Sequence, residues 1–222
     1  MKIEDKRICD VIDGSAEAED ILEEAGVDYW FGWERMLRPA CEAANVDPDD
    51  LAARLISCRP TAGGEPQPAT LGELLRQSDQ QWRERLAPAI ASVVAAGAGL
   101  RAGRSEGATR LLLDLQKQLE RHLAASRALL PVAGAIEEGQ AGSVGRESIR
   151  AFRLEHLDFA RMARDLGQEA DRLAADADLA EVVSAMRTVI REIHRHIKVG
   201  YNFILPRLVA AAGARQVAFE PW

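Results

Sequence analysis

The chain has 222 residues, enough for one domain with a small companion but too few for a large multidomain enzyme. Apolar residues make up 47% of the sequence and charged residues 28%, which excludes intrinsic disorder and predicts a packed core. The 28 basic and 35 acidic residues give a formal net charge of −7, which argues against nucleic-acid binding. No apolar run approaches the roughly 20 residues that span a bilayer, so we expect a soluble, cytoplasmic protein without membrane attachment.

The composition predicts an all-α fold, because Ala, Leu, Glu and Arg are abundant and aromatic residues make up only 5%. Residues 59–69 contain three prolines and two glycines, which predicts a linker. It separates a small helical N-terminal module, residues 1–58, from a main domain, residues 70–209, and a C-terminal tail, residues 210–222. Within the module we expect helices over residues 15–25 and 34–44 and a third that begins at Pro48 after the cap residue Asp47. The aromatic segment 27–33 either supplies the core of this module or docks it on the larger domain.

Apolar stripes at helical spacing predict four long helices in the main domain. The first begins with a capping box at Thr70 and is expected to kink at Pro88, before a Gly-rich turn at residues 97–103. The second follows Ser105 and ends at Pro131, and residues 132–145 are expected to be a loop. The third follows Gly145, and the fourth begins near residue 178. Amphipathic helices with short connections predict an antiparallel four-helix bundle.

The histidines carry the most informative pattern in the sequence. Three of them, His122, His156 and His196, fall on the apolar stripes of three different helices, whereas His194 is expected at the surface or boundary. A single inward histidine is more often a hydrogen-bonded core residue. Three of them favour a shared metal site, because buried imidazoles are costly unless something bonds or coordinates them.

The sequence resembles the hemerythrin-like iron-centre-repair proteins, a di-iron family. The resemblance rests on the order of module and bundle, on the motifs at residues 27–29 and 40–44, and on His196 ten residues ahead of Pro206, and it covers nearly the whole chain. It implies a hemerythrin-like fold, a role in repairing iron–sulfur clusters damaged by nitric oxide or oxidants, and iron–sulfur proteins as partners.

The chain departs from the family in its chemical residues. Trp30 and Phe31 stand where the family has a cysteine pair. The family also repeats a histidine, a glutamate four residues later and a proline six further on, in each of two helices. Counting back from Pro206 gives His196 and Gly200, so one bridging carboxylate is missing.

Counting back from Pro131 gives Arg121 and Ala125, and only a shift of one residue brings in His122 and Ser126. The family's histidine of the first helix falls near Trp82. Only His156 and His196 match, and imidazoles without inward carboxylates do not suit an ordinary oxo-bridged di-iron centre.

Three hypotheses therefore remain open. In the first, Trp82 fills the vacated space, and a metal-free scaffold or regulatory bundle engages a partner or a second copy of the chain, as a homodimer, through residues 29–33. In the second, which we favour, the three histidines bind iron or another divalent metal ion in a pocket walled by Trp82, Gly200 and Tyr201, helped by one of three acids if it reaches inward: Glu155, Asp158 or Glu192. In the third, the loss of side chains at Ala125 and Gly200 opens a cavity for haem, ligated by His156 or His196.

Overall fold

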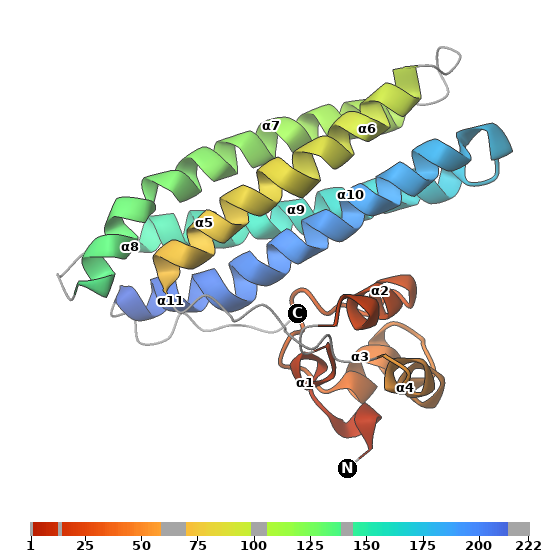
Figure 1. Ribbon diagram of the computed structural model, residues 1–222, viewed down its shortest axis with the longest axis horizontal. Coiled ribbons are helices and arrows are strands. Elements are labelled where there is room, and N and C mark those ends of the chain that lie inside the picture. Colours follow the sequence, from red (N-terminus) through yellow and green to blue (C-terminus); the bar gives the residue numbers. More distant parts are fainter. Residues whose placement is uncertain (1, 13–14, 59–69, 99–105, 139–143, 213–222) are drawn as a thin grey trace. The chain divides into compact units, whose positions relative to one another are not determined.

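The structure, a computed structural model, describes residues 2–12, 15–58, 70–98, 106–138 and 144–212. Every regular element in these ranges is a helix, apart from an isolated antiparallel bridge between Arg7 and Met36 (Figure 1). The predicted all-α class is therefore confirmed. The chain divides into two compact units, Met1–Gln67 and Pro68–Trp222. The expected linker at 59–69, residues 99–103 of the expected Gly-rich turn and the tail beyond residue 212 lie outside the described residues.

The N-terminal unit is built from short helices. The predicted cap at Asp47 is confirmed, because its carboxylate accepts hydrogen bonds from the amides of Asp49 and Asp50. Ser15, where a helix was expected to start, is also an N-cap, and its side chain accepts a hydrogen bond from the amide of Ala18. The first two elements were not predicted, because segments of three and five residues are too short to show a hydrophobic period. The elements are η1 (Ile3–Asp5), α1 (Ile8–Ile12), α2 (Ala16–Glu24), α3 (Leu37–Ala43) and α4 (Pro48–Ile56).

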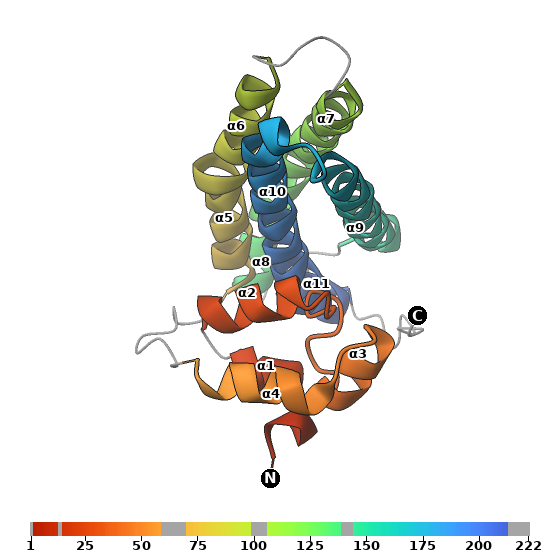
Figure 2. The ribbon, with the colours of Figure 1, turned by 90° about the vertical axis from the view of Figure 1, so that its right-hand side faces the viewer.

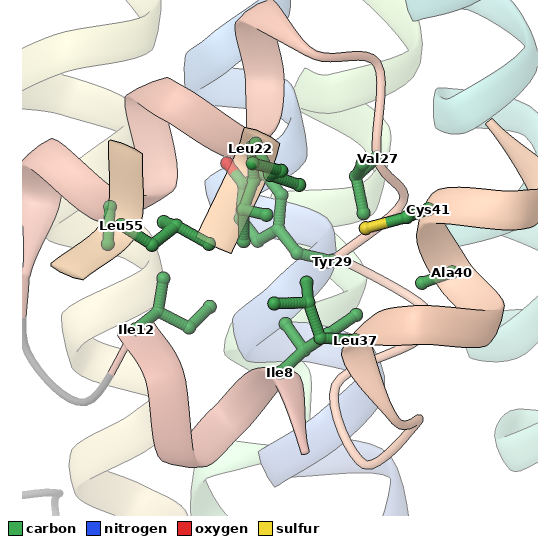
Figure 3. Packing of buried hydrophobic residues seen from close by; sticks show 11 residues of the cluster. Ile8, Ile12, Leu22, Val27, Tyr29, Leu37, Ala40, Cys41 and Leu55 are labelled. Carbon is green, nitrogen blue, oxygen red and sulfur yellow. The ribbon is translucent and has the colours of Figure 1, made fainter. Parts of the chain in front are cut away.

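One apolar cluster holds this unit together, and the aromatic segment contributes to it. Tyr29 is only 1% exposed and lies among residues of α1 to α4, with Trp30 and Trp33 packed against the cluster (Figure 3). Cys41 is buried in the same cluster, and burial raises the pKa of its thiol. The segment therefore supplies core to the unit, the first of the two roles that the sequence left open.

The helices of the second unit join into long rods. The first rod is α5 (Leu71–Gln81), η2 (Trp82–Leu86) and α6 (Ala87–Ala98); the second is α7 (Glu106–Ala128) and α8 (Leu130–Glu137); the third is α9 (Arg146–Leu173); and the fourth is α10 (Ala180–Val199), η4 (Gly200–Ile204) and α11 (Leu205–Ala211), preceded by the short η3 (Ala177–Leu179). Both α6 and α9 pack against α7 on one side and α10 on the other. Figure 2 shows α6 continuing the line of α5.

Two rods contain a π-helical turn at the same distance before a proline. Proline has no amide proton, so Pro88 and Pro206 cannot bond the carbonyl four residues earlier. The preceding residues adjust by bonding five residues back: the Ala87 amide donates to the Trp82 carbonyl, and the Leu205 amide donates to the Gly200 carbonyl. The expected disturbance at Pro88 thus takes the form of a π-turn.

The second rod behaves differently at its proline. The α7 helix ends at Ala128, and Pro131 lies in the first turn of α8, where a missing amide proton costs nothing. Proline therefore ends one helix and opens the next. The prediction of a loop over residues 132–145 is wrong for residues 132–137, which are helical.

Candidate metal centre

Three rods bring the predicted histidines together in the core of the second unit. His122 comes from α7, His156 from α9 and His196 from α10, and they are 2%, 0% and 4% exposed. One ring nitrogen of each lies within 4.8 Å of those of the other two. The ring centroids are 4.8 Å apart for His122 and His156, 5.1 Å for His122 and His196, and 5.4 Å for the stacked rings of His156 and His196.

Each Nδ1 atom in this trio is bonded to a group outside it. His122 Nδ1 lies 2.6 Å from a carboxylate oxygen of Glu155, and His156 Nδ1 lies 2.8 Å from the carbonyl oxygen of Phe152. Ionised carboxylates and carbonyls only accept hydrogen bonds, so the Nδ1 atoms of His122 and His156 are the donors, and in a neutral ring with this tautomer Nε2 carries the lone pair. His196 Nδ1 pairs with the Ser78 hydroxyl at 3.3 Å.

The Nε2 atoms are left without comparable partners. Among the described residues, no group hydrogen-bonds the buried Nε2 atoms of His156 and His196. His122 Nε2 has only the Ser126 hydroxyl, at a long 3.4 Å. Buried nitrogens of this kind are costly, and a metal ion bound through Nε2 satisfies them while Nδ1–H keeps its outer acceptor. The donor set therefore fits one metal ion.

Burial keeps the imidazoles of His156 and His196 in the neutral form that binds metal. Desolvation, followed by the neighbouring His122, lowers the pKa of His196 from 6.5 to about 3. Desolvation, followed by His122 and His196, places the pKa of His156 well below 6.5, against the opposing hydrogen bond to Phe152. At neutral pH these two rings need not lose a proton before they bind a cation.

Gly200 lies beneath the ring of His156. A Cβ atom at position 200 would overlap Nε2 of His156 and come within 2.6 Å of its Cδ2. The space left by a missing side chain is thus filled by a neighbouring imidazole. Ala125 is exposed, so neither position opens the cavity that the haem hypothesis requires.

Two phenylalanine rings pack against the trio. Phe152 and Phe159 lie 5.3 Å and 5.2 Å from the ring of His122, and Phe152 lies 4.3 Å from that of His156, centroid to centroid. The rings contact one another, which leaves no space for a porphyrin between them.

The acids weighed as additional ligands bond elsewhere. Glu155 bonds the outer nitrogen of His122. Asp158 accepts from Arg161 at 2.6 Å and from Gln118 at 3.5 Å, and Glu192 accepts from Arg195 at 2.5 Å. The expectation that one of them joins the histidines as a ligand is therefore not met. Glu155 instead hydrogen-bonds one of the three histidines at its Nδ1 atom.

The remaining predicted residues occupy different places. Trp82 is 9% exposed and begins the π-turn one helical turn after Ser78. Tyr201 is half-buried and packs against the apolar cluster that includes Leu71, Leu208 and Phe152. His194 is buried at 7% exposure, so the expected surface or boundary position is wrong, and it does not belong to the trio. The α10 helix has neighbours on several sides, which buries more of its circumference than one stripe.

The structure also selects between the two registers of α7. Arg121 and Ala125 are exposed, whereas His122 and Ser126 are buried. Sequence reasoning missed Ser78 as a partner of His196, although its place on the apolar stripe of a helix was a usable signal. A polar residue among leucines needs a bonding partner.

No protein-family model matches this sequence, and a comparison with curated proteins finds no match. None of the helices in the described part of the chain combines the length and apolar character needed to cross a membrane.

Proposed function

We propose that this protein is a hemerythrin-like antiparallel four-helix bundle whose His122, His156 and His196 bind a single iron or other divalent metal ion. The observation that carries the proposal is the pair of buried Nε2 atoms, on His156 and His196, that no described group hydrogen-bonds. Three imidazole nitrogen donors suit divalent iron, zinc, copper or nickel. By resemblance, its biology is the repair of iron–sulfur clusters under nitrosative or oxidative stress.

Two arguments support one ion over the family's di-iron pair. Position 200 has no side chain to bridge two metals, and the ring of His156 fills the space beside it. The nearest acid, Glu155, bonds the outer nitrogen of His122 and so does not supply a bridge. Two ferric ions would therefore lack the anionic ligands that balance their charge.

A metal-free bundle that acts through a partner is the second candidate. The stacking of His156 and His196 and their contacts with Phe159 favour it, because these rings also pack as ordinary core side chains. Its partner surface would lie in the N-terminal unit but would exclude Tyr29, which is buried.

Metal analysis and an ultraviolet–visible spectrum, on protein purified without chelator, test the proposal. We expect about one metal ion per chain and its loss when His156 and His196 are both replaced by Ala. The control is His194→Ala, which removes a buried imidazole of the same helix from outside the trio and should leave the metal content unchanged. A metal-free protein that takes up no added Fe²⁺, Co²⁺ or Zn²⁺ would support the second candidate, and a Soret band would support haem.

A further inference from the structure

We propose that Glu155 is a positioning residue that fixes the proton of His122 on Nδ1 and thereby turns the Nε2 lone pair toward His156 and His196. The inference deepens the proposed metal site, on which it rests for its consequence but not for its geometry. It assigns Glu155 the task of keeping the trio ready to bind a cation.

The contact joins a partly exposed acid to a buried ring. The Glu155 side chain is 33% exposed, whereas that of His122 is 2% exposed, and the oxygen–nitrogen distance is 2.6 Å. A hydrogen bond of this length with an ionised acceptor is among the stronger ones in proteins. Glu155 lies next to His156 on α9, so one helix supplies both a member of the trio and the acceptor for another member.

His122 has a choice of tautomer that His156 lacks. Ser126 lies 3.4 Å from His122 Nε2, and a hydroxyl oxygen accepts as well as donates. With the proton on Nε2, His122 would donate to Ser126 and present no lone pair to a metal ion. The Glu155 carboxylate can only accept a hydrogen bond, so it holds the proton on Nδ1 and excludes the tautomer with the proton on Nε2.

Glu155 also supplies negative charge close to the site. Asp158 and Glu192 are tied to Arg161 and Arg195, so their charges are already compensated. An acceptor behind a metal-binding histidine raises the basicity of the ring, and its loss typically weakens metal affinity by about 10- to 100-fold.

Two substitutions separate the roles of acceptor and charge. Glu155→Ala removes both, whereas Glu155→Gln keeps a carbonyl acceptor without the charge. Asp158→Ala is the matched control, because it removes a carboxylate of the same helix that pairs with Arg161 rather than with a ring of the trio. Circular dichroism and thermal unfolding establish that each variant is folded, and Glu155→Gln carries the test if Glu155→Ala does not fold.

The first readout needs no metal. Long-range ¹H–¹⁵N spectra of the metal-free protein report which ring nitrogen carries the proton. We expect His122 protonated on Nδ1 in the wild type, in Asp158→Ala and in Glu155→Gln, and a shift toward Nε2 protonation in Glu155→Ala. Glu155→Gln should nevertheless perturb the Nδ1 resonance, because a neutral acceptor forms a weaker hydrogen bond. An unchanged His122 signal in Glu155→Ala, or in Glu155→Gln where that variant carries the test, overturns the inference.

The second readout is Co²⁺ affinity, followed by the absorption of the bound ion. We expect about 10- to 100-fold weaker binding in Glu155→Ala, a smaller loss in Glu155→Gln and none in Asp158→Ala. Equal Co²⁺ affinity in the wild type and both Glu155 variants contradicts the inference. If the wild type binds no Co²⁺ while the tautomer still shifts, the positioning role stands and the proposed metal site fails.

Discussion

The imidazole of His156 rests directly on the backbone of Gly200, across the contact between α9 and η4. A side chain at position 200 would overlap Nε2 of His156, so only glycine lets this ring reach the trio. Glycine in a helix costs about 1 kcal/mol relative to alanine. The glycine at position 200 is therefore explained by the ring of His156, which occupies the space that a side chain would take.

Replacing Gly200 with Ala should displace the ring of His156 and destabilise the protein. We expect the helix-propensity gain of about 1 kcal/mol to be outweighed by an overpacking cost of about 1–3 kcal/mol, together with loss of metal binding. Urea unfolding and a Co²⁺ titration measure both effects.

The matched control is Gly167→Ala in α9. A Cβ atom there would meet only the Cδ1 atom of Ile190, at 3.9 Å, so we expect a gain of up to about 1 kcal/mol. If Gly200→Ala stabilises the protein as much as Gly167→Ala does, the ring of His156 does not occupy this place.

Replacing Ser78 with Ala should loosen His196. The substitution removes the hydroxyl 3.3 Å from His196 Nδ1 and leaves that buried nitrogen without its observed partner. We expect a loss of about 1 kcal/mol in the free energy of unfolding and about 10-fold weaker Co²⁺ binding. Ser184→Ala on the exposed side of α10 is the control and should change neither quantity. If the two variants have the same free energy of unfolding and the same Co²⁺ affinity, the Ser78 hydroxyl does not support His196.

The metal-free protein should lose stability in mild acid. In the unfolded chain these histidines titrate near 6.5, whereas the folded-state pKa of His196 is lowered to about 3 and that of His156 lies well below 6.5, in both cases chiefly because the rings are buried. Below pH 6.5 the unfolded state therefore binds protons at these histidines that the folded state does not bind. The free energy of unfolding should fall by up to about 1.4 kcal/mol per pH unit for each ring, down to about pH 3 for His196.

Urea unfolding of metal-free protein at several values between pH 4 and pH 8 measures this dependence. His196→Gln removes one of the two titrating rings and should flatten the slope by about half. Above pH 7 the contribution of these rings should be constant. A slope that is the same in the variant and the wild type would show that other groups cause the acid sensitivity.

The helical period gave the right members of the trio, because it depends only on which side of each helix is buried. Counting back from Pro131 with the family's spacing was wrong by one residue on α7, because it selects Arg121 instead of His122. The distance to the following proline is ten residues for Ser78 and His196, where a π-turn intervenes, but nine for His122. A π-turn inserts one residue into a helix, and the second rod has a break at Leu129 instead. The sequence does not show which prolines induce a π-turn.

The sequence also could not predict that the ring of His156 fills the space at Gly200. A missing side chain leaves a cavity only if its neighbours do not move in, and this depends on the approach of α9 to η4, which no local pattern encodes. The outer bonds to Glu155 and Ser78 join residues on different rods and depend on the same packing.

Anomalous diffraction from crystals of the Co²⁺-loaded protein, recorded at the cobalt edge, tests the central claim most directly. We predict a single anomalous peak per chain in the core of the second unit, about 2.0–2.2 Å from the Nε2 atoms of His122, His156 and His196. Two peaks in the core, or a peak bonded to other side chains while the three rings keep their apolar contacts, would contradict it.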